Sequence, residues 1–185
     1  MTPSGGFTAE DLMRLRGLPR HTELIDGNLV PAAPQGKWHS RVINLLVAEL
    51  DRQAPAGLRA DREMTVRLAK RQAPEPDVVV VTAEAYERDE PSTYYVPEDV
   101  VLAIEAVSPD SEERDRDTKP RKYAKAGIRY YWRVENDEGR TVVYLYERDP
   151  ATECFSLTGI HHDQLKTTAP FTIDIDLTSV GKRSA

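Results

Sequence analysis

The chain has 185 residues, of which 39% are hydrophobic and 30% charged, and its formal net charge at pH 7 is −6. A chain of this size and composition is expected to fold as one domain, residues 1–185, with a substantial core. We expect neither a membrane association nor a signal peptide, because no apolar stretch approaches the roughly 20 residues that cross a bilayer. The acidic balance argues against coating of nucleic acid through bulk charge. The single cysteine, Cys154, excludes an intrachain disulfide and predicts a cytoplasmic location.

The first third of the chain predicts two helices and a hairpin. Thr8 and Asp11 have the spacing of a capping box, so a short helix is expected to begin there and end near residues 17–19. Asp26-Gly27 supplies the positive backbone angles of a tight turn, which predicts a hairpin between residues 23–25 and 29–30. Residues 39–53 carry apolar side chains at helical spacing, which predicts an amphipathic helix.

The rest of the chain predicts mainly strands. Residues 64–68 alternate like a strand, whereas residues 78–81 and 100–104 are almost continuously apolar and are expected at the centre of a sheet. Gly127 is expected to end a helix, and residues 130–134 and 141–146 are expected to pair around a turn. This order predicts an α/β (α+β) fold in which a mixed central β-sheet is flanked by helices.

Two acidic side chains stand at the ends of the two central strands. Asp77 precedes residues 78–81, and Glu105 follows residues 100–104. A carboxylate at a strand end is rigidly aimed yet reachable by solvent, which suits a ligand of Mg²⁺, for which Mn²⁺ can substitute. The backbone carbonyl of Ala106 could add another oxygen. Asp77 alone could simply begin its strand, but an ionised Glu105 in an apolar run is costly unless it is paired or bound to metal.

The segment from residue 110 to 133 is more basic than the chain as a whole. It holds eight Lys or Arg residues and five Asp or Glu residues, a local excess of about three positive charges. Arg114, Arg116 and Arg121 are candidate phosphate contacts, although a solvated helical face explains such side chains equally well. His39, at a helix start, could contact phosphate or a neighbouring acid, or could be structural.

These motifs together resemble the Uma2 family, a branch of the PD-(D/E)XK restriction-endonuclease-like superfamily. The resemblance implies a restriction-endonuclease-like core, a magnesium-dependent nuclease site and residue roles that follow from the matching positions. Asp77 corresponds to the first acid of the superfamily motif and Glu105 to the second, while Glu23 matches an additional acid near the metal. The resemblance rests on residues 23–27, His39, 76–78, 105–109, Asp115, Lys119, Tyr123, 127–128 and 131–132.

The lysine of the motif departs from the superfamily pattern. Its usual place, two positions after the second acid, is occupied by Val107. Lys119 fits the family spacing Asp-x-x-x-Lys-x-x-x-Tyr and is the expected substitute, with Lys122 as the fallback. Because Pro120 is tolerated only in the first turn of a helix, we expect the helix to begin near Thr118 and Asp115 to lie in the preceding loop.

We therefore expect a Mg²⁺-dependent endonuclease that hydrolyses phosphodiester bonds in DNA. Its metal would be held by Asp77, Glu105 and the Ala106 carbonyl, and Lys119 would orient water or stabilise developing charge. A binding module of the same fold without catalysis, and a purely structural interaction protein, are the alternatives. A homodimer is expected, because such folds often cut two strands by symmetry. The candidate catalytic residues are Glu23, Asp77, Glu105 and Lys119, and the candidate substrate contacts are His39, Arg114, Arg116 and Lys122.

Overall fold

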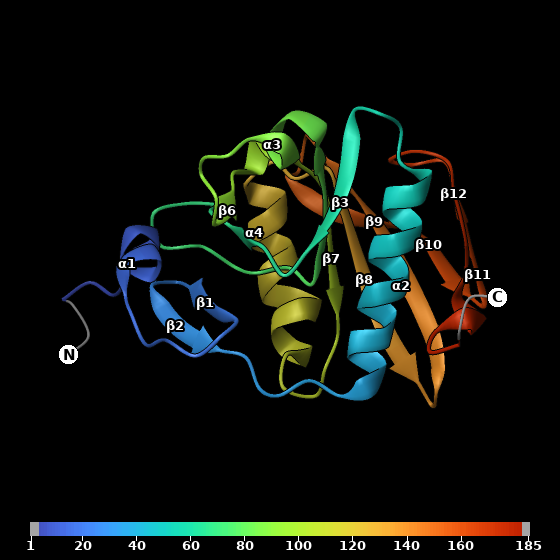
Figure 1. The fold of residues 1–185 in the computed structure, drawn as a ribbon, viewed down its shortest axis with the longest axis horizontal. Helices are drawn as coiled ribbons and strands as arrows, with labels where there is room; N and C mark the ends of the chain where they lie inside the picture. The colour runs from blue at the N-terminus through green and yellow to red at the C-terminus, as the bar shows by residue number, and fades with distance from the viewer. Residues whose placement is uncertain (1–3, 183–185) are drawn as a thin grey trace.

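The computed structural model describes residues 4–182, and its centre is a six-stranded mixed sheet (Figure 1). Only the β7–β8 pair is parallel; the other neighbouring strands of this sheet run antiparallel. The two apolar runs form β5 and β7, and β5 lies between β3 and β7, as their nearly continuous hydrophobicity predicts. In sheet order the strands are β10 (Cys154–His162), β9 (Arg140–Asp149), β8 (Tyr130–Asp137), β7 (Val100–Ala106), β5 (Val78–Thr82) and β3 (Leu58–Arg62).

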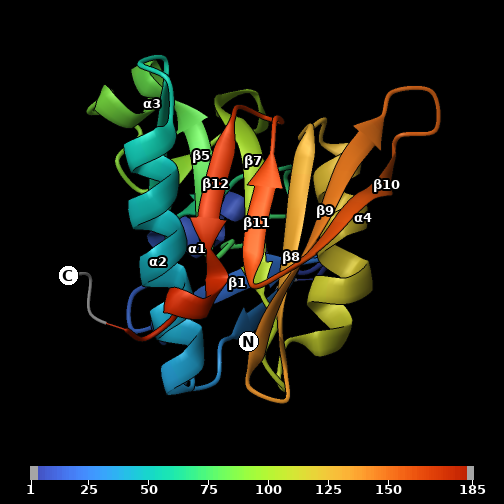
Figure 2. The same cartoon turned by 90° about the vertical axis from the view of Figure 1, so that its right-hand side faces the viewer.

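Two layers cover the sheet (Figures 1 and 2). The amphipathic helix α2 and the hairpin β11–β12 pack on one face, where Leu46 and Leu165 join the larger hydrophobic cluster. Helix α4 packs on the other face, where Tyr123 joins Ala103 and Tyr131. No helix within residues 4–182 is long and apolar enough to cross a membrane. The covering elements are α2 (Lys37–Gln53), β11 (Gln164–Thr167), β12 (Ile173–Asp176), η3 (Leu177–Ser179) and α4 (Lys119–Lys125).

The N-terminal segment forms a small unit beside the sheet. The capping box at Thr8 is confirmed, and so is the hairpin, whose turn has positive φ at Asp26 (52°) and Gly27 (77°). Leu24 bridges to Ala73, which attaches the hairpin to the segment that leads into β5. The remaining elements are α1 (Ala9–Arg14), β1 (Thr22–Ile25), β2 (Asn28–Pro31), β4 (Thr65–Val66), α3 (Ala83–Glu87), β6 (Tyr94–Tyr95) and η1 (Pro97–Asp99).

The expectation that Asp115 lies in a loop before the helix is wrong. A π-helical turn, η2 (Arg114–Thr118), runs directly into α4, so Asp115 is already helical. The proline explains the wide turn: Pro120 has no N–H to donate, and the Lys119 N–H donates instead to the Arg114 carbonyl, five residues earlier. The helix therefore begins one turn earlier than the sequence predicted, and it delivers both Asp115 and Lys119.

Gly127 ends α4 as expected, with φ of 92°. A Cβ at this position would meet no atom within 4 Å, so replacement by alanine tests backbone strain alone. We expect Gly127→Ala to lower the free energy of unfolding by about 1–2 kcal/mol in urea titrations. Gly57, whose φ lies outside the left-handed region and whose Cβ position is equally open, is the matched control. Gly57→Ala should change stability by less than about 1 kcal/mol; equal losses in both variants would contradict the assigned role.

Candidate active site

Antiparallel pairing brings the two strand-end carboxylates together. Val78 at the start of β5 is opposite Ile104 near the end of β7, so the next residues along, Asp77 and Glu105, meet at the same end of the sheet. Glu105 shares the face of β7 with Ala103, the face covered by α4, and is only 1% exposed. The central strands thus place one carboxylate at the sheet end and a second one beneath α4.

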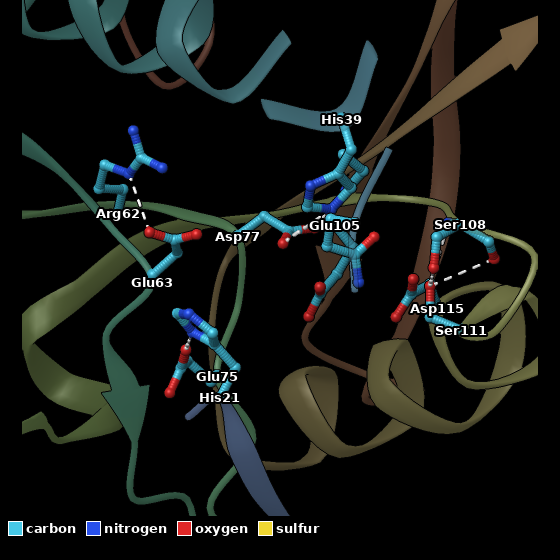
Figure 3. A network of polar contacts seen from close by, with 12 residues as sticks. His21, His39, Arg62, Glu63, Glu75, Asp77, Glu105, Ser108, Ser111 and Asp115 are labelled. Carbon is cyan, nitrogen blue, oxygen red and sulfur yellow. Dashed lines mark hydrogen bonds and ion pairs between the residues drawn. The ribbon is translucent and has the colours of Figure 1, made fainter. Parts of the chain in front are cut away.

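Asp77 is fixed by neighbours on two other elements (Figure 3). Its Oδ2 accepts a hydrogen bond of 2.7 Å from the Ala106 N–H, and its Oδ1 lies 3.1 Å from Nε2 of His39, near the start of α2. Figure 3 shows the Asp77 carboxylate directed at His39, with Glu105 beside it. His39 is itself buried, so it holds this carboxylate in one orientation.

Lys119 occupies the centre of the site. Its side chain is 4% exposed, and its Nζ lies 2.9 Å from Glu23 Oε1 and 3.2 Å from Glu105 Oε1. Asp115 Oδ1 is also 3.2 Å away, across one helical turn. Burial by itself disfavours the charged lysine, but the surrounding carboxylates, Glu105 foremost, outweigh it and hold the pKa of Lys119 well above its usual value. The lysine is therefore a permanent positive charge among buried acids.

The buried acids exceed what one lysine can neutralise. Burial raises the pKa of Glu105 well above its usual range; Lys119 opposes this rise, while Asp115 and Asp77 reinforce it. Burial likewise raises the pKa of Asp115. Tyr123 donates a 2.5 Å hydrogen bond to Oε1 of Glu105, the same oxygen that faces Lys119. A further cation near Glu105 would relieve this excess of negative charge.

The acids, His39 and Lys119 line an open cavity of about 370 Å³. Its lining holds seven carboxylates but only two cations, Arg114 and Lys119. Glu75, whose pKa is raised by burial, lies 2.5 Å from Nδ1 of His21 at the same cavity. The cavity is therefore strongly acidic, which favours a metal cation over a bare phosphate group. The lining acids are Glu23, Glu63, Glu75, Asp77, Glu105, Asp110 and Asp115.

The donor chemistry fits a hard divalent cation. Within residues 4–182 no group of three or more His, Cys, Asp or Glu side chains has a metal-holding arrangement. Mg²⁺ commonly takes only one or two carboxylates and completes its shell with water and substrate oxygens, which Asp77 and Glu105 can satisfy. Burial raises the pKa of Glu105, and a dication beside this carboxylate would favour its ionised form.

The structure brings some of the expected site residues together and leaves others apart. Glu23, His39, Asp77, Glu105, Lys119 and Arg114 all line the cavity. Arg116 does not: it pairs with Glu112 and Glu135 on the outer side of η2. Lys122 also lies outside the cavity lining, with its Nζ 2.7 Å from Oδ1 of Asp26.

Sequence reasoning missed two polar roles in this site. Tyr123 is buried in the core, and its hydroxyl also donates a hydrogen bond to Glu105. Asp115, expected in a loop, is 1% exposed and pairs with Lys119. The signal was present in the spacing, because residues 115, 119 and 123 are four apart and share one face of a continuous helix. Pro120 argued against such a helix and led to the prediction that Asp115 lies in a loop.

Comparisons with known proteins identify the family and the fold of this chain. The model of the Uma2 family, described as “Putative restriction endonuclease”, matches residues 9–171. The chain belongs to the Uma2 family. The resemblance inferred from the sequence motifs is thereby confirmed, and family and fold together indicate a restriction-endonuclease-like protein.

A solved structure shows the same fold as this Uma2 chain. A crystal structure described as “a putative nuclease belonging to DUF820 from Anabaena variabilis ATCC 29413” superposes with a TM-score of 0.70. The two sequences are 19% identical, and the match covers 94% of this chain and 97% of that one. The expected α/β core with a mixed sheet is confirmed. No curated protein matches the chain.

Removal of the buried lysine charge should destabilise this Uma2 protein strongly. Lys119→Met leaves Glu23, Glu105 and Asp115 without their shared cation, so we expect a loss of about 3–5 kcal/mol in the free energy of unfolding near pH 8. The loss should shrink toward pH 5. Carboxyl groups with raised folded-state pKa values hold protons that the unfolded chain releases, so stability falls as pH rises through this window.

Urea titrations at several pH values measure both effects. Lys122→Met is the matched control, since Lys122 makes a single ion pair with the exposed Asp26 and should cost less than about 1 kcal/mol at every pH. A pH-independent loss in Lys119→Met, or equal losses in both variants, would contradict the coupling of Lys119 to the buried acids.

Proposed function

We propose that this Uma2 protein is a metal-dependent endonuclease that hydrolyses phosphodiester bonds in DNA. The observation that carries the proposal is the meeting of Asp77, Glu105 and Lys119 at one open, acidic cavity. Asp77 and Glu105 are the residues that would hold Mg²⁺ or Mn²⁺, with the Ala106 carbonyl as a further donor. The metal would neutralise phosphate charge and lower the pKa of a bound water.

The residues of the chain have separate roles in this proposal. Lys119 lines the cavity, where it can orient a water or stabilise charge that develops on the phosphate. His39 orients Asp77, and Tyr123 orients Glu105, through the contacts already described. Arg114 lines the cavity, where it pairs with Asp110, and is the candidate contact for a phosphate oxygen.

A binding module without catalysis is the second candidate, and one observation favours it. Lys119 is held by three carboxylates, so its Nζ has few free donors for a water or a phosphate. The homodimer, the choice of DNA and the cytoplasmic location stay predictions from the sequence. Cleavage and metal binding, measured separately, distinguish the enzyme from the module.

The cleavage test uses the two strand-end acids. We expect the purified protein to nick supercoiled plasmid DNA with Mg²⁺ or Mn²⁺ but not with EDTA. Glu105→Gln and Asp77→Asn should each reduce the nicking rate by about two orders of magnitude or more. Glu113→Gln, at an exposed acid outside the cavity, is the matched control and should keep the wild-type rate. Wild-type activity in Glu105→Gln would refute the mechanism.

The metal test needs no substrate. We expect saturating Mg²⁺ to raise the melting temperature of the wild type, since a ligand at 100 times its Kd adds about 2.7 kcal/mol of stability. Glu105→Gln keeps an acceptor for Tyr123 but loses the charge, so its melting temperature should not respond. Metal-induced stabilisation without nicking would support the binding module instead. An absence of metal binding in the wild type, by melting temperature and by calorimetry, would overturn the proposed site.

A further inference from the structure

A second cavity lies on the outer side of the helical segment that carries the catalytic lysine. Its volume is about 410 Å³, which is within the range of small-molecule sites. Residues of η2 and α4 form one wall, and residues of β8, β9 and the start of β10 form the other. It shares no lining residue with the catalytic cavity.

One wall of this outer cavity is aromatic. Tyr131, Tyr146 and Phe155 line it from three neighbouring strands. The rings of Tyr131 and Phe155 are stacked, with centroids 5.6 Å apart and planes 29° apart, and the centroids of Tyr131 and Tyr146 are 5.8 Å apart. Tyr146 and Phe155 are only half-buried, so parts of their rings are open to the cavity. Such rings are platforms on which a planar base stacks.

The rest of the lining is cationic, in contrast to the acidic chain. Four Arg or Lys side chains and two acids, Asp117 and Glu153, line the outer cavity, a net charge of about +2 in a protein of net charge −6. Two of the four cations, Arg116 and Arg133, are also paired with Glu135 outside the lining, so the cations at the rim are Arg121 and Lys125. Lys125 is exposed and has no ion pair within residues 4–182. Among the described residues Arg121 pairs only with exposed Asp117, and because such surface pairs are weak, a phosphate can compete for the guanidinium.

We propose that the outer cavity is a binding site for a nucleotide, with the base on the aromatic wall and the phosphate at the cationic rim. Other classes of ligand would use only one half of this lining. A purely apolar ligand would leave the cations unused, and inorganic phosphate would leave the aromatic wall unused. The nucleotide could be free in solution or be one unit of a single strand. The inference does not depend on the proposed cleavage chemistry.

The outer cavity is joined to the catalytic cavity through one residue. The ring of Tyr131 lines the outer cavity, and its hydroxyl donates a 2.5 Å hydrogen bond to the Asp115 carbonyl. The Asp115 side chain contacts Lys119 in the catalytic cavity. A nucleotide bound outside would therefore contact the same two helical turns that position the catalytic lysine.

The native cysteine provides a direct test. Cys154 is exposed, lines the outer cavity and is the single cysteine of the chain, so its rate of alkylation by neutral iodoacetamide reports occupancy without any substitution. With the full-length wild type in EDTA, we expect saturating adenosine 5′-monophosphate or a short oligodeoxyadenylate to slow alkylation at least about tenfold. Adenosine and inorganic phosphate at the same concentrations should protect much less, because each fills half of the site.

The arms of this experiment separate the two sources of the nucleotide. Stronger protection by the oligonucleotide than by the mononucleotide identifies a single strand as the ligand, and equal or stronger protection by the mononucleotide identifies a free nucleotide. Absence of protection by both at millimolar concentration would overturn the proposal. Protection by adenosine or by phosphate alone that equals protection by the mononucleotide would overturn it as well.

Two pairs of variants locate the effect. Lys125→Ala should raise the half-protecting concentration of the tighter ligand about tenfold, while Lys70→Ala, at an exposed lysine outside the cavity, should not. Phe155→Ala should weaken protection similarly, with Leu157→Ala on the same strand as its control. Because exposed Lys125 makes no core contact, its variant keeps the test valid if Phe155→Ala unfolds. Unchanged protection in Lys125→Ala would contradict the cationic half of the site.

Discussion

The burial of Lys119 among carboxylates is the constraint on which the rest of the site depends. Charges removed from water are costly unless they are paired, and this lysine is paired with Glu23 of β1, Glu105 of β7 and Asp115 of η2. The strands β1 and β7 must therefore be correctly placed against the η2–α4 segment before the burial of these charges is energetically tolerable. Burial and the neighbouring acids oppose the ionisation of Glu105 more strongly than Lys119 favours it, and a bound metal ion would favour the ionised form.

The π turn before α4 resolves a conflict within the sequence. Pro120 removes one helical hydrogen bond at the position where Asp115 and Lys119 need to share a helical face. A wider turn lets the helix begin before the proline, with the Lys119 N–H donating to the Arg114 carbonyl. Irregular helical turns of this type are often found at functional sites. Here Pro120 causes the irregular turn. The turn brings Lys119 of the helix to the carboxylates, whereas the strand position two residues after Glu105 holds Val107.

The two sides of this helical segment have opposite electrostatic character. The inner side faces a cavity with seven carboxylates, and the outer side faces a cavity with a net positive lining and an aromatic wall. An acidic protein can thus present an acidic cavity and a basic cavity lining on the two sides of one helical segment. Tyr131 connects them, because its ring belongs to one and its hydroxyl holds the backbone of the other.

The sequence by itself determined the elements whose signal is local. The apolar runs of β5 and β7, the turn at Asp26-Gly27 and the stop at Gly127 each follow from the preferences of neighbouring residues. The positions of Asp77 and Glu105 at two strand ends could also be predicted, because strand boundaries depend on neighbouring residues. The family resemblance added Lys119 to the predicted site. The number of residues between Lys119 and the strand-end acids does not by itself show that they are close in space.

Only the tertiary structure decided what these residues contact. The β5–β7 register brings Asp77 beside Glu105, and the packing of α2 brings His39 to Asp77. The π turn decided that Lys119 enters the site, whereas Lys122 pairs with Asp26. The sign of the net charge that lines each cavity also depends on which elements the fold brings together. Sequence periodicity indicates which face of an element is buried. Contacts and the local electrostatic potential depend on several elements at once, and their relative placement is set only by the folded chain.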